Sequence, residues 1–229
     1  MLKPLAENLW HAEFVRLGHG MQTPCRMVVA RLPNGDLWLH SPIPIDDALA
    51  STLKTLGPVR HIVAPNAFHH LYLAACGQRY PRACLYAAPG LPRRLPSLPF
   101  AATLTDQAPQ AWHGAFEQCV VQGFPWPWSE VVFFHRATAT VIVTDLVLNV
   151  HKPKGWVTSL MFGIARGYRG VTLSRFWRRV MMPADRREAT RNAAARVLAW
   201  DAHRLVMSHG EMTQQHVRTW LRKELHWAF

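Results

Sequence analysis

HIVAPNAFHHLY, residues His61–Tyr72, is the stretch that best indicates the fold of this sequence. The apolar residues of His61–Ala64 predict a short buried strand, and Pro65 with the asparagine after it predicts a turn. Two adjacent histidines, His69 and His70, follow at the point where an apolar helix is expected to begin. Sites in layered α/β proteins are usually built where strands end. We therefore expect the rest of the chain to be arranged around this corner.

The composition is that of a folded α/β protein. The chain has 229 residues, of which 49% are hydrophobic and 17% are charged, and this balance excludes a disordered chain. No run of eighteen apolar residues predicts a transmembrane helix, and the N-terminal segment lacks the apolar run of a secretory signal. The four cysteines form no CxxC pair, which argues against a disulfide framework or a zinc knuckle. We expect a cytoplasmic protein with reduced thiols.

The pattern of strands and helices predicts two central sheets with helices outside them. Two hairpins are expected, one joining Arg26–Leu32 to Leu37–His40 and a later one joining Glu130–His135 to Thr140–Val143. Helices are predicted at Ile45–Leu56, Leu71–Gln78, Arg186–Trp200 and Thr213–Leu225, with Thr213 as an N-cap, and a strand at Arg204–Met207. Met21–Pro24 is predicted to be a turn, and Arg93–Pro99 a basic loop. This order favours a four-layer αββα sandwich in a single domain over residues 1–229.

A basic, aromatic insertion is expected at about residues 151–184. The formal net charge of the chain is +12, and this segment holds seven Lys or Arg residues with no Asp or Glu. Its aromatic residues include Trp156, Phe162, Phe176 and Trp177. The segment could form a lid over a site, lie on an anionic membrane surface, or be an ordinary pair of solvated helices. Nucleic acid is the least favoured partner, because no nucleic-acid-binding motif accompanies the charge. The candidate anion or membrane contacts are Lys152, Lys154, Arg166, Arg169, Arg175, Arg178 and Arg179.

Several polar residues are predicted at the ends of strands. They are His40, the pair His69 and His70, Asp145 after TVIVT, and His209 after RLVM. Because the ends of such strands face a common rim, these side chains are expected to meet there. Imidazole nitrogen and carboxylate oxygen both suit Zn²⁺ and similar divalent ions, and a bound ion would lower the pKa of a water to about 7.

Each of these residues also has a purely structural interpretation. Adjacent histidines can share one metal only in a turn, so one of the pair is expected to cap a helix or pack in the core. Asp145 could accept backbone hydrogen bonds, His209 could be a loop residue, and His40 could be a packed histidine bonded to a backbone carbonyl. Glu130 could be a ligand or general base at the rim, or an exposed residue that opens its strand.

The order of these pieces resembles the metallo-β-lactamase superfamily. Val63–Leu71 looks like the HxHxDH loop of that superfamily, Val141–Leu148 like the strand that carries the metal-bridging Asp, and Val206–Glu211 like the final histidine turn. Leu37–Pro42 stands where the superfamily has its first motif. The set HSPI, APNxxHH, EVVFFHR, TDLxxN and SHGE more closely resembles an uncharacterised branch, a domain family of unknown function.

The resemblance also implies that one of the two usual metal positions is depleted. If the last two motif positions fall on His69 and His70, the first two histidine positions are Pro65 and Ala67. If Asn66 takes the first position instead, the second is a phenylalanine and His70 falls on the Asp. Either alignment removes two ligands of the first metal. The histidine expected between the second and third motifs is replaced by tryptophans, of which Trp126 is a rim candidate.

Two functions therefore remain open from the sequence. The first is a metal-dependent hydrolase for a small-molecule substrate, with one divalent ion, zinc being the leading candidate, held by His69, His70, Asp145 and His209. In it Asp145 and His70 are the candidate catalytic residues, and Asp145 also orients water. The second is a catalytically degenerate protein of the same fold that binds an anionic ligand, a membrane surface or a protein partner. No GxSxG, P-loop or GxGxxG motif supports a serine hydrolase or a nucleotide-binding protein.

Overall fold

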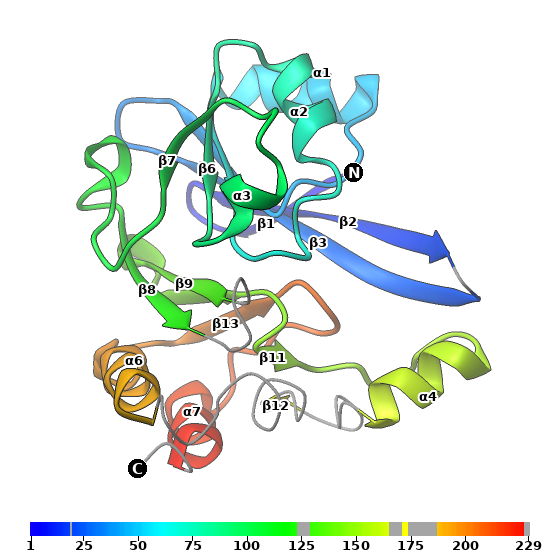
Figure 1. The fold of residues 1–229 in the computed structure, drawn as a ribbon, viewed down its shortest axis with the longest axis vertical. Helices are drawn as coiled ribbons and strands as arrows, with labels where there is room; N and C mark the ends of the chain where they lie inside the picture. Colours follow the sequence, from blue (N-terminus) through cyan, green and yellow to red (C-terminus); the bar gives the residue numbers. More distant parts are fainter. Residues whose placement is uncertain (19, 123–128, 165–170, 174–186, 227–229) are drawn as a thin grey trace.

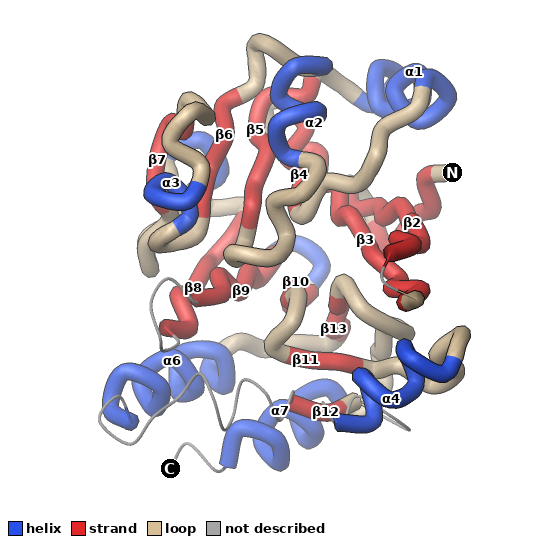
Figure 2. Tube along the Cα trace, turned by 45° about the vertical axis from the view of Figure 1, so that its right-hand side comes forward, coloured by secondary structure: helices blue, strands red, loops and turns tan. Residues whose placement is uncertain are grey.

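The computed structural model describes residues 1–18, 20–122, 129–164, 171–173 and 187–226 (Figure 1). Within these residues the chain forms two central sheets, and helices cover the outer face of each (Figures 1 and 2). The four-layer αββα sandwich predicted from the sequence is therefore confirmed. In the described part of the chain, no helix is both long and apolar enough to cross a membrane.

The first sheet has seven strands in the order in which they occur in the sequence. Its first half is antiparallel, and the strands from β4 onward run parallel. Helices α1 and α2 follow two of the parallel strands, which need a crossover to the next strand. The strands are β1 (Leu2–Ala6), β2 (Leu9–Gly18), β3 (Met21–Arg31), β4 (Leu37–His40), β5 (Val59–Ala64), β6 (Cys84–Ala87) and β7 (Phe100–Thr103), and the helices are α1 (Asp47–Leu56), α2 (Leu73–Arg79) and α3 (Leu91–Arg94).

The second sheet has four strands in the order β13-β10-β9-β8. Strands β8, β9 and β10 are antiparallel neighbours, whereas β13 pairs parallel with β10. These strands are β8 (Phe116–Gln122), β9 (Ser129–His135), β10 (Thr140–Val143) and β13 (Arg204–Met207), covered by helices α6 (Arg187–Ala199) and α7 (Val217–Leu225). A small third sheet pairs β11 (Val147–Leu148) with β12 (Thr172–Leu173), helix α4 (Trp156–Ile164) lies between them in sequence, and two short 3-10 turns span Gln110–Trp112 and Arg136–Thr138.

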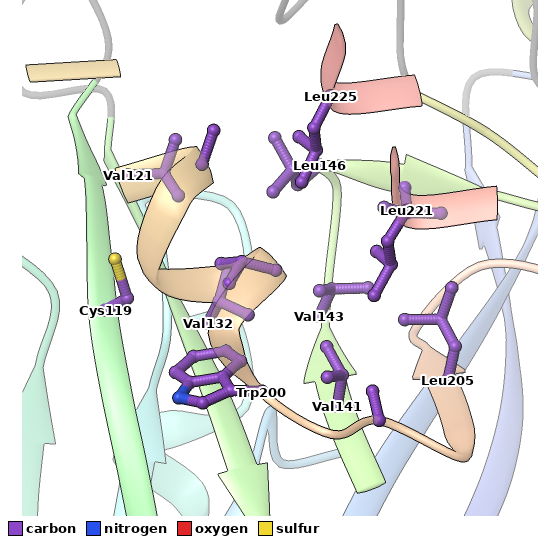
Figure 3. Packing of buried hydrophobic residues seen from close by; sticks show 14 of the residues in the cluster. Cys119, Val121, Val132, Val141, Val143, Leu146, Trp200, Leu205, Leu221 and Leu225 are labelled. Atoms are coloured by element: carbon purple, nitrogen blue, oxygen red, sulfur yellow. The ribbon is translucent and has the colours of Figure 1, made fainter. Parts of the chain in front are cut away.

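Three apolar clusters hold the layers together. The central one lies between the two sheets and contains Trp38, Val63, Phe133 and Val206, none of which is exposed. A second cluster lies beneath α1 and α2, and a third lies between the second sheet and helices α6 and α7 (Figure 3). Because each strand presents alternate side chains to its two faces, both sheets are buried on both sides. The ends of β5, β10 and β13 are therefore fixed on a rigid base.

Both predicted hairpins are present, but the turn predicted at Met21–Pro24 is wrong. These residues belong to β3, which pairs along its whole length with β2. Strand β4 pairs only with the later part of β3, so Pro24 stands where β3 has a free edge. A proline is tolerated there because its missing N–H would have no strand to meet.

Three other local predictions differ from the structure. The loop predicted at Arg93–Pro99 begins inside the short helix α3. The last helix begins at Val217, and its N-cap is His216 rather than Thr213. Thr213 instead exchanges backbone hydrogen bonds with Leu205, which extends the edge of the second sheet. The edge strands β1 and β7 were not predicted, because short edge strands lack a regular apolar pattern.

Candidate metal centre

The corner after β5 is shaped by Asn66. Its side-chain oxygen accepts the backbone N–H groups of Phe68, at 2.9 Å, and His69, at 2.8 Å. This side chain thus closes the turn and sets the direction in which His69 leaves it. The carbonyl of Pro65 accepts the N–H of Val131 at 2.8 Å, which ties the corner to β9 of the second sheet.

Three potential ligand atoms converge beside this corner. The Nε2 atom of His69 lies 3.4 Å from Oδ2 of Asp145, and Nε2 of His209 lies 3.0 Å from Oδ1 of the same carboxylate. The two Nε2 atoms are 3.2 Å apart. Asp145 and His209 follow the paired strands β10 and β13 of the second sheet, and His69 follows β5 of the first, so packing of the two sheets brings His69 to the other two.

Each histidine is also held through its other ring nitrogen. Nδ1 of His69 lies 2.5 Å from the hydroxyl of Ser41, and Nδ1 of His209 lies 2.6 Å from the carbonyl oxygen of Pro24. A carbonyl can only accept, so Nδ1 of His209 carries the hydrogen and its Nε2 is directed at Asp145. Such partners fix the ring orientation of metal-binding histidines.

The electrostatics of the centre favour an ionised carboxylate. Burial alone would raise the pKa of Asp145, but His69 and His209 outweigh burial and hold that pKa far below its ordinary value. Burial would likewise lower the pKa of His209, yet its contacts with Asp145 and with the Pro24 carbonyl raise it overall. The Asp145 carboxylate and the His209 imidazole therefore stabilise each other's charged forms.

Glu130 supports the turn that carries Asp145. It is fully buried, and its carboxylate accepts the backbone N–H groups of Thr144 at 2.6 Å, Asp145 at 2.9 Å and Leu146 at 2.9 Å. Burial first, and the Asp145 charge second, raise the pKa of Glu130 to about 7. The expectation that Glu130 is an exposed strand-start residue is wrong, because it closes a buried turn.

The amide of Asn66 completes the surroundings of Asp145. Its Nδ2 donates to Oδ2 of Asp145 at 2.7 Å and to the hydroxyl of Thr144 at 2.8 Å. Asn66 thus faces the carboxylate, as in the alignment that gives it the first histidine position. That alignment is not reproduced in full, because His69 rather than His70 reaches the centre. The side-chain oxygen of Asn66 accepts hydrogen bonds from the corner, and its amide donates to Asp145. Both polar groups of this side chain are therefore hydrogen-bonded.

His70 does not join the three converging atoms, which corrects the predicted set of four ligands. Among the described residues, the cluster of histidines and acids consists of His69, Asp145 and His209. His70 is half-buried, and burial, followed by the nearby charge of Arg94, lowers its pKa. The backbone carbonyl of His70 accepts from Leu73 at the start of the next helix. Consecutive residues in this turn point in different directions, so of the two adjacent histidines only His69 reaches Asp145.

His40 lies in the core between the sheets. It is completely buried against Trp38 and Phe133, with ring centroids 5.5 and 5.4 Å away. Within the described part of the chain neither of its ring nitrogens has a hydrogen-bond partner, so the predicted bond to a backbone carbonyl is not formed. Burial lowers the pKa of His40 to about 3 and keeps it neutral.

The remaining candidate site residues either are exposed near α4 or lie outside the described part of the chain. Lys152 and Lys154 are exposed just before α4. Outside the described residues lie Trp126, Arg166, Arg169, Arg175, Arg178 and Arg179.

Sequence reasoning missed several supporting residues. Ser41 and Asn66 are polar neighbours of the predicted histidines, and their positions next to strand ends were the available signal. Pro24 acts through its backbone carbonyl, for which the sequence carries no signal. Arg26 is buried, donates to the carbonyl of Met207 and lies 2.8 Å from Glu13, so it supports the strand that leads to His209.

The three ligand atoms fit a single divalent ion. A tetrahedral zinc with ligand distances of about 2.0–2.1 Å separates its ligands by about 3.3–3.4 Å. The two histidine nitrogens are 3.2 Å apart, close to this value, and one ligand atom from each of the three residues lies within 4.8 Å of the others. Three protein ligands of this type, with one further coordination position, are also the pattern of catalytic rather than structural zinc.

Several solved structures of metallo-β-lactamases share this architecture. The DIM-1 metallo-β-lactamase exposed to ceftazidime matches with a TM-score of 0.66 and 13% identity, over 100% of this chain and 97% of the other. FIM-1 from Pseudomonas aeruginosa, in its mono-zinc form, has a TM-score of 0.65 and 15% identity over 100% and 95%. The enzyme from Pontibacter korlensis has a TM-score of 0.61 and 16% identity over 99% and 98%. No curated protein sequence matches this chain significantly.

The chain therefore has the metallo-β-lactamase fold. Residues 7–163 match the family described as "Domain of unknown function (DUF4336)", and this match covers more than half of the chain. The chain belongs to that family. The predicted resemblance to an uncharacterised branch of the metallo-β-lactamase superfamily is thus confirmed.

Proposed function

We propose that this protein is a hydrolase that uses a single divalent metal ion, with zinc as the leading candidate. The observation that carries the proposal is the convergence of ligand atoms from His69, Asp145 and His209, at separations suited to one ion. That both histidines are oriented through their other nitrogens supports a prepared site. Four free cysteines agree with the expected reducing, cytoplasmic setting.

The residues of the centre would have distinct roles. When bound, the ion would polarise a substrate oxygen and lower the pKa of a water to about 7. Asp145 would supply a carboxylate oxygen to the ion beside the Nε2 atoms of the two histidines, whose rings are held through Nδ1. Glu130 fixes the backbone of Asp145, and Asn66 holds its side chain. Replacing Glu130 or Asn66 would therefore misplace the metal ligands without removing any ligand.

The substrate class follows only in outline. An ester, thioester, amide or phosphoester bond is compatible with this chemistry. The formal net charge of +12 favours a small anionic substrate, because a basic surface concentrates anions. His70, which the sequence predicts to be a catalytic residue, has no role in this proposal.

Metal content of the untagged protein tests the proposal. We expect close to one zinc, iron or manganese per chain by elemental mass spectrometry, and loss of that metal in Asp145→Ala and His209→Ala. His70→Ala is the matched control and should keep the metal, because His70 lies outside the cluster. A parent protein that stays free of metal after incubation with each ion would refute the proposal. Equal metal loss in His70→Ala would refute the three-residue ligand set.

A second candidate is a binding protein that has lost catalysis. The observation in its favour is Asn66, whose hydrogen bonds fill the place beside Asp145 where the superfamily has a ligand. A panel of ester, thioester, amide and phosphoester substrates separates the two functions. Hydrolysis that is lost in Asp145→Ala supports the enzyme, whereas a stoichiometric metal without hydrolysis of any member supports the binding protein.

A further inference from the structure

Helix α4 presents an apolar face to solvent. Trp156 is 79% exposed and Ile164 is 64% exposed, and Leu160 and Met161 between them are also exposed. These positions are spaced by four, one and three residues, so they lie on one side of the helix. Side chains of this size are normally buried, and a contiguous exposed set marks a surface that binds something.

The opposite side of α4 is anchored to the rest of the protein. Thr158 is buried, and its hydroxyl accepts the backbone N–H of Gln22 in β3 at 2.9 Å. The ring of Phe162 lies 6.4 Å from the ring of His209, so this side of the helix borders the candidate metal centre. The helix is therefore held in place while its apolar face points outward.

The end of the β2–β3 hairpin extends this surface. Leu17 is 72% exposed and Val15 is half exposed, and both precede the turn that joins the strands. Figure 1 shows that the hairpin and α4 project from the same end of the molecule. The contact between Gln22 and Thr158 joins the two elements directly.

Positive charge accompanies the apolar surface. Lys152 and Lys154 are exposed in the turn that leads into α4. The sequence from 151 to 184 contains seven Lys or Arg residues and no acid. An apolar helix face with cations beside it matches the chemistry of an anionic bilayer surface, where apolar side chains enter the interface and cations meet lipid headgroups.

We propose that α4 and the end of the β2–β3 hairpin dock on the surface of an anionic lipid bilayer. The nine residues of α4 are too few to span a membrane, so the helix lies along the interface. A bilayer is favoured over a protein partner because the charges beside the apolar face have one sign. This docking does not require the metal, so it is tested separately from the hydrolase proposal.

Sedimentation of the full chain with vesicles tests the docking. Vesicles of phosphatidylcholine alone are compared with vesicles that contain about a third phosphatidylglycerol. We expect at least tenfold stronger binding to the anionic vesicles, and weaker binding when salt is raised to about 0.5 M. The Trp156→Ser/Ile164→Ser and Lys152→Glu/Lys154→Glu double variants should each reduce binding at least tenfold.

Controls separate docking from unfolding and from self-association. Leu71→Ser removes an exposed apolar side chain outside α4 and the hairpin, and should leave binding unchanged. Thermal melts should be the same for all variants, because the substituted side chains are exposed. Failure to bind anionic vesicles, or binding that both double variants retain, would overturn the proposal. A dimer in light scattering that Trp156→Ser/Ile164→Ser dissociates would assign the surface to a second copy of the chain instead.

Discussion

At the scale of single residues, the candidate centre depends on buried polar groups that each have one task. Asp145 receives one histidine on each carboxylate oxygen, while Glu130 receives the backbone N–H groups around it. A buried carboxylate with several N–H donors forms stronger hydrogen bonds than a neutral acceptor does. The two acids are therefore not interchangeable: one faces the ligands and the other holds the turn.

Replacing Glu130 by glutamine tests this division of roles. The amide group of the new side chain would face N–H donors that now meet a carboxylate oxygen, so at least one donor would lose its partner. We expect the free energy of unfolding, measured by urea denaturation, to fall by about 2–3 kcal/mol. Glu211→Gln, an exposed acid, should change it by less than about 0.5 kcal/mol. Equal values for the two variants would contradict a role for Glu130 in the buried turn.

At the scale of elements, a link between the two sheets positions the strand that ends at His209. Arg26 of β3 donates to the carbonyl of Met207 at the end of β13, and the hydroxyl of Ser208 donates to the carbonyl of Arg26 at 3.3 Å. Glu13 lies 2.8 Å from the guanidinium and balances its charge. Burial alone would raise the pKa of Glu13, but hydrogen bonds from Arg26 and Lys3, together with the Arg26 charge, lower it to about 2. The sheets are thus joined by polar contacts beside the apolar core.

Arg26→Met should weaken this link. The loss of the guanidinium leaves the Met207 carbonyl without its donor and Glu13 without its buried partner, so we expect destabilisation of about 2–3 kcal/mol. Arg26→Lys should recover only part of this, because an ammonium group cannot donate to several partners as the planar guanidinium does. Arg60→Met, at a side chain that is 38% exposed, is the control and should cost under about 0.5 kcal/mol. Full recovery of the free energy of unfolding in Arg26→Lys would show that the positive charge alone stabilises this link.

At the scale of the whole molecule, buried groups make stability depend on pH: His135 and His40 lower it in mild acid, whereas Glu130, whose pKa burial raises to about 7, acts in the opposite direction. His135 is buried beside Phe116, and burial lowers its pKa from 6.5 to about 4. Between these two values the unfolded chain binds a proton that the folded protein does not, so the free energy of unfolding falls as the pH falls. His40, whose pKa burial lowers to about 3, acts in the same direction.

Unfolding measured at pH 7 and pH 5 checks this behaviour. His135 should account for about 2 kcal/mol of the loss between these values. His135→Gln should remove that part of the pH dependence while keeping a polar group near Thr138, which lies 2.8 Å from the histidine ring. His203→Gln is the exposed control and should leave the slope as in the parent. A pH dependence in His135→Gln equal to that of the parent would contradict the lowered pKa of the buried histidine.

Local patterns in the sequence were sufficient for most of the fold. The hairpin turn at Pro33–Asp36, the apolar strands of the second sheet and the periodic helix after Asp46 each follow from short-range chemistry. Their alternation then indicated the four layers, because each amphipathic element must bury one face. The wrong predictions fall at Met21–Pro24, the start of the last helix and the edge strands, where strand pairing rather than an apolar pattern determines the structure.

For the candidate centre, the sequence by itself supplied the chemical types, and only the tertiary structure decided which side chains meet. Histidines and an acid at strand ends were visible in the chain, but His69 and His70 are neighbours that no pattern distinguishes. The turn closed by Asn66 directs one imidazole at Asp145. The Ser41 hydroxyl lies 28 residues from His69 in the sequence, and the Pro24 carbonyl lies 185 residues from His209. Such contacts are set by how two sheets pack against each other, and packing is a property of the whole chain.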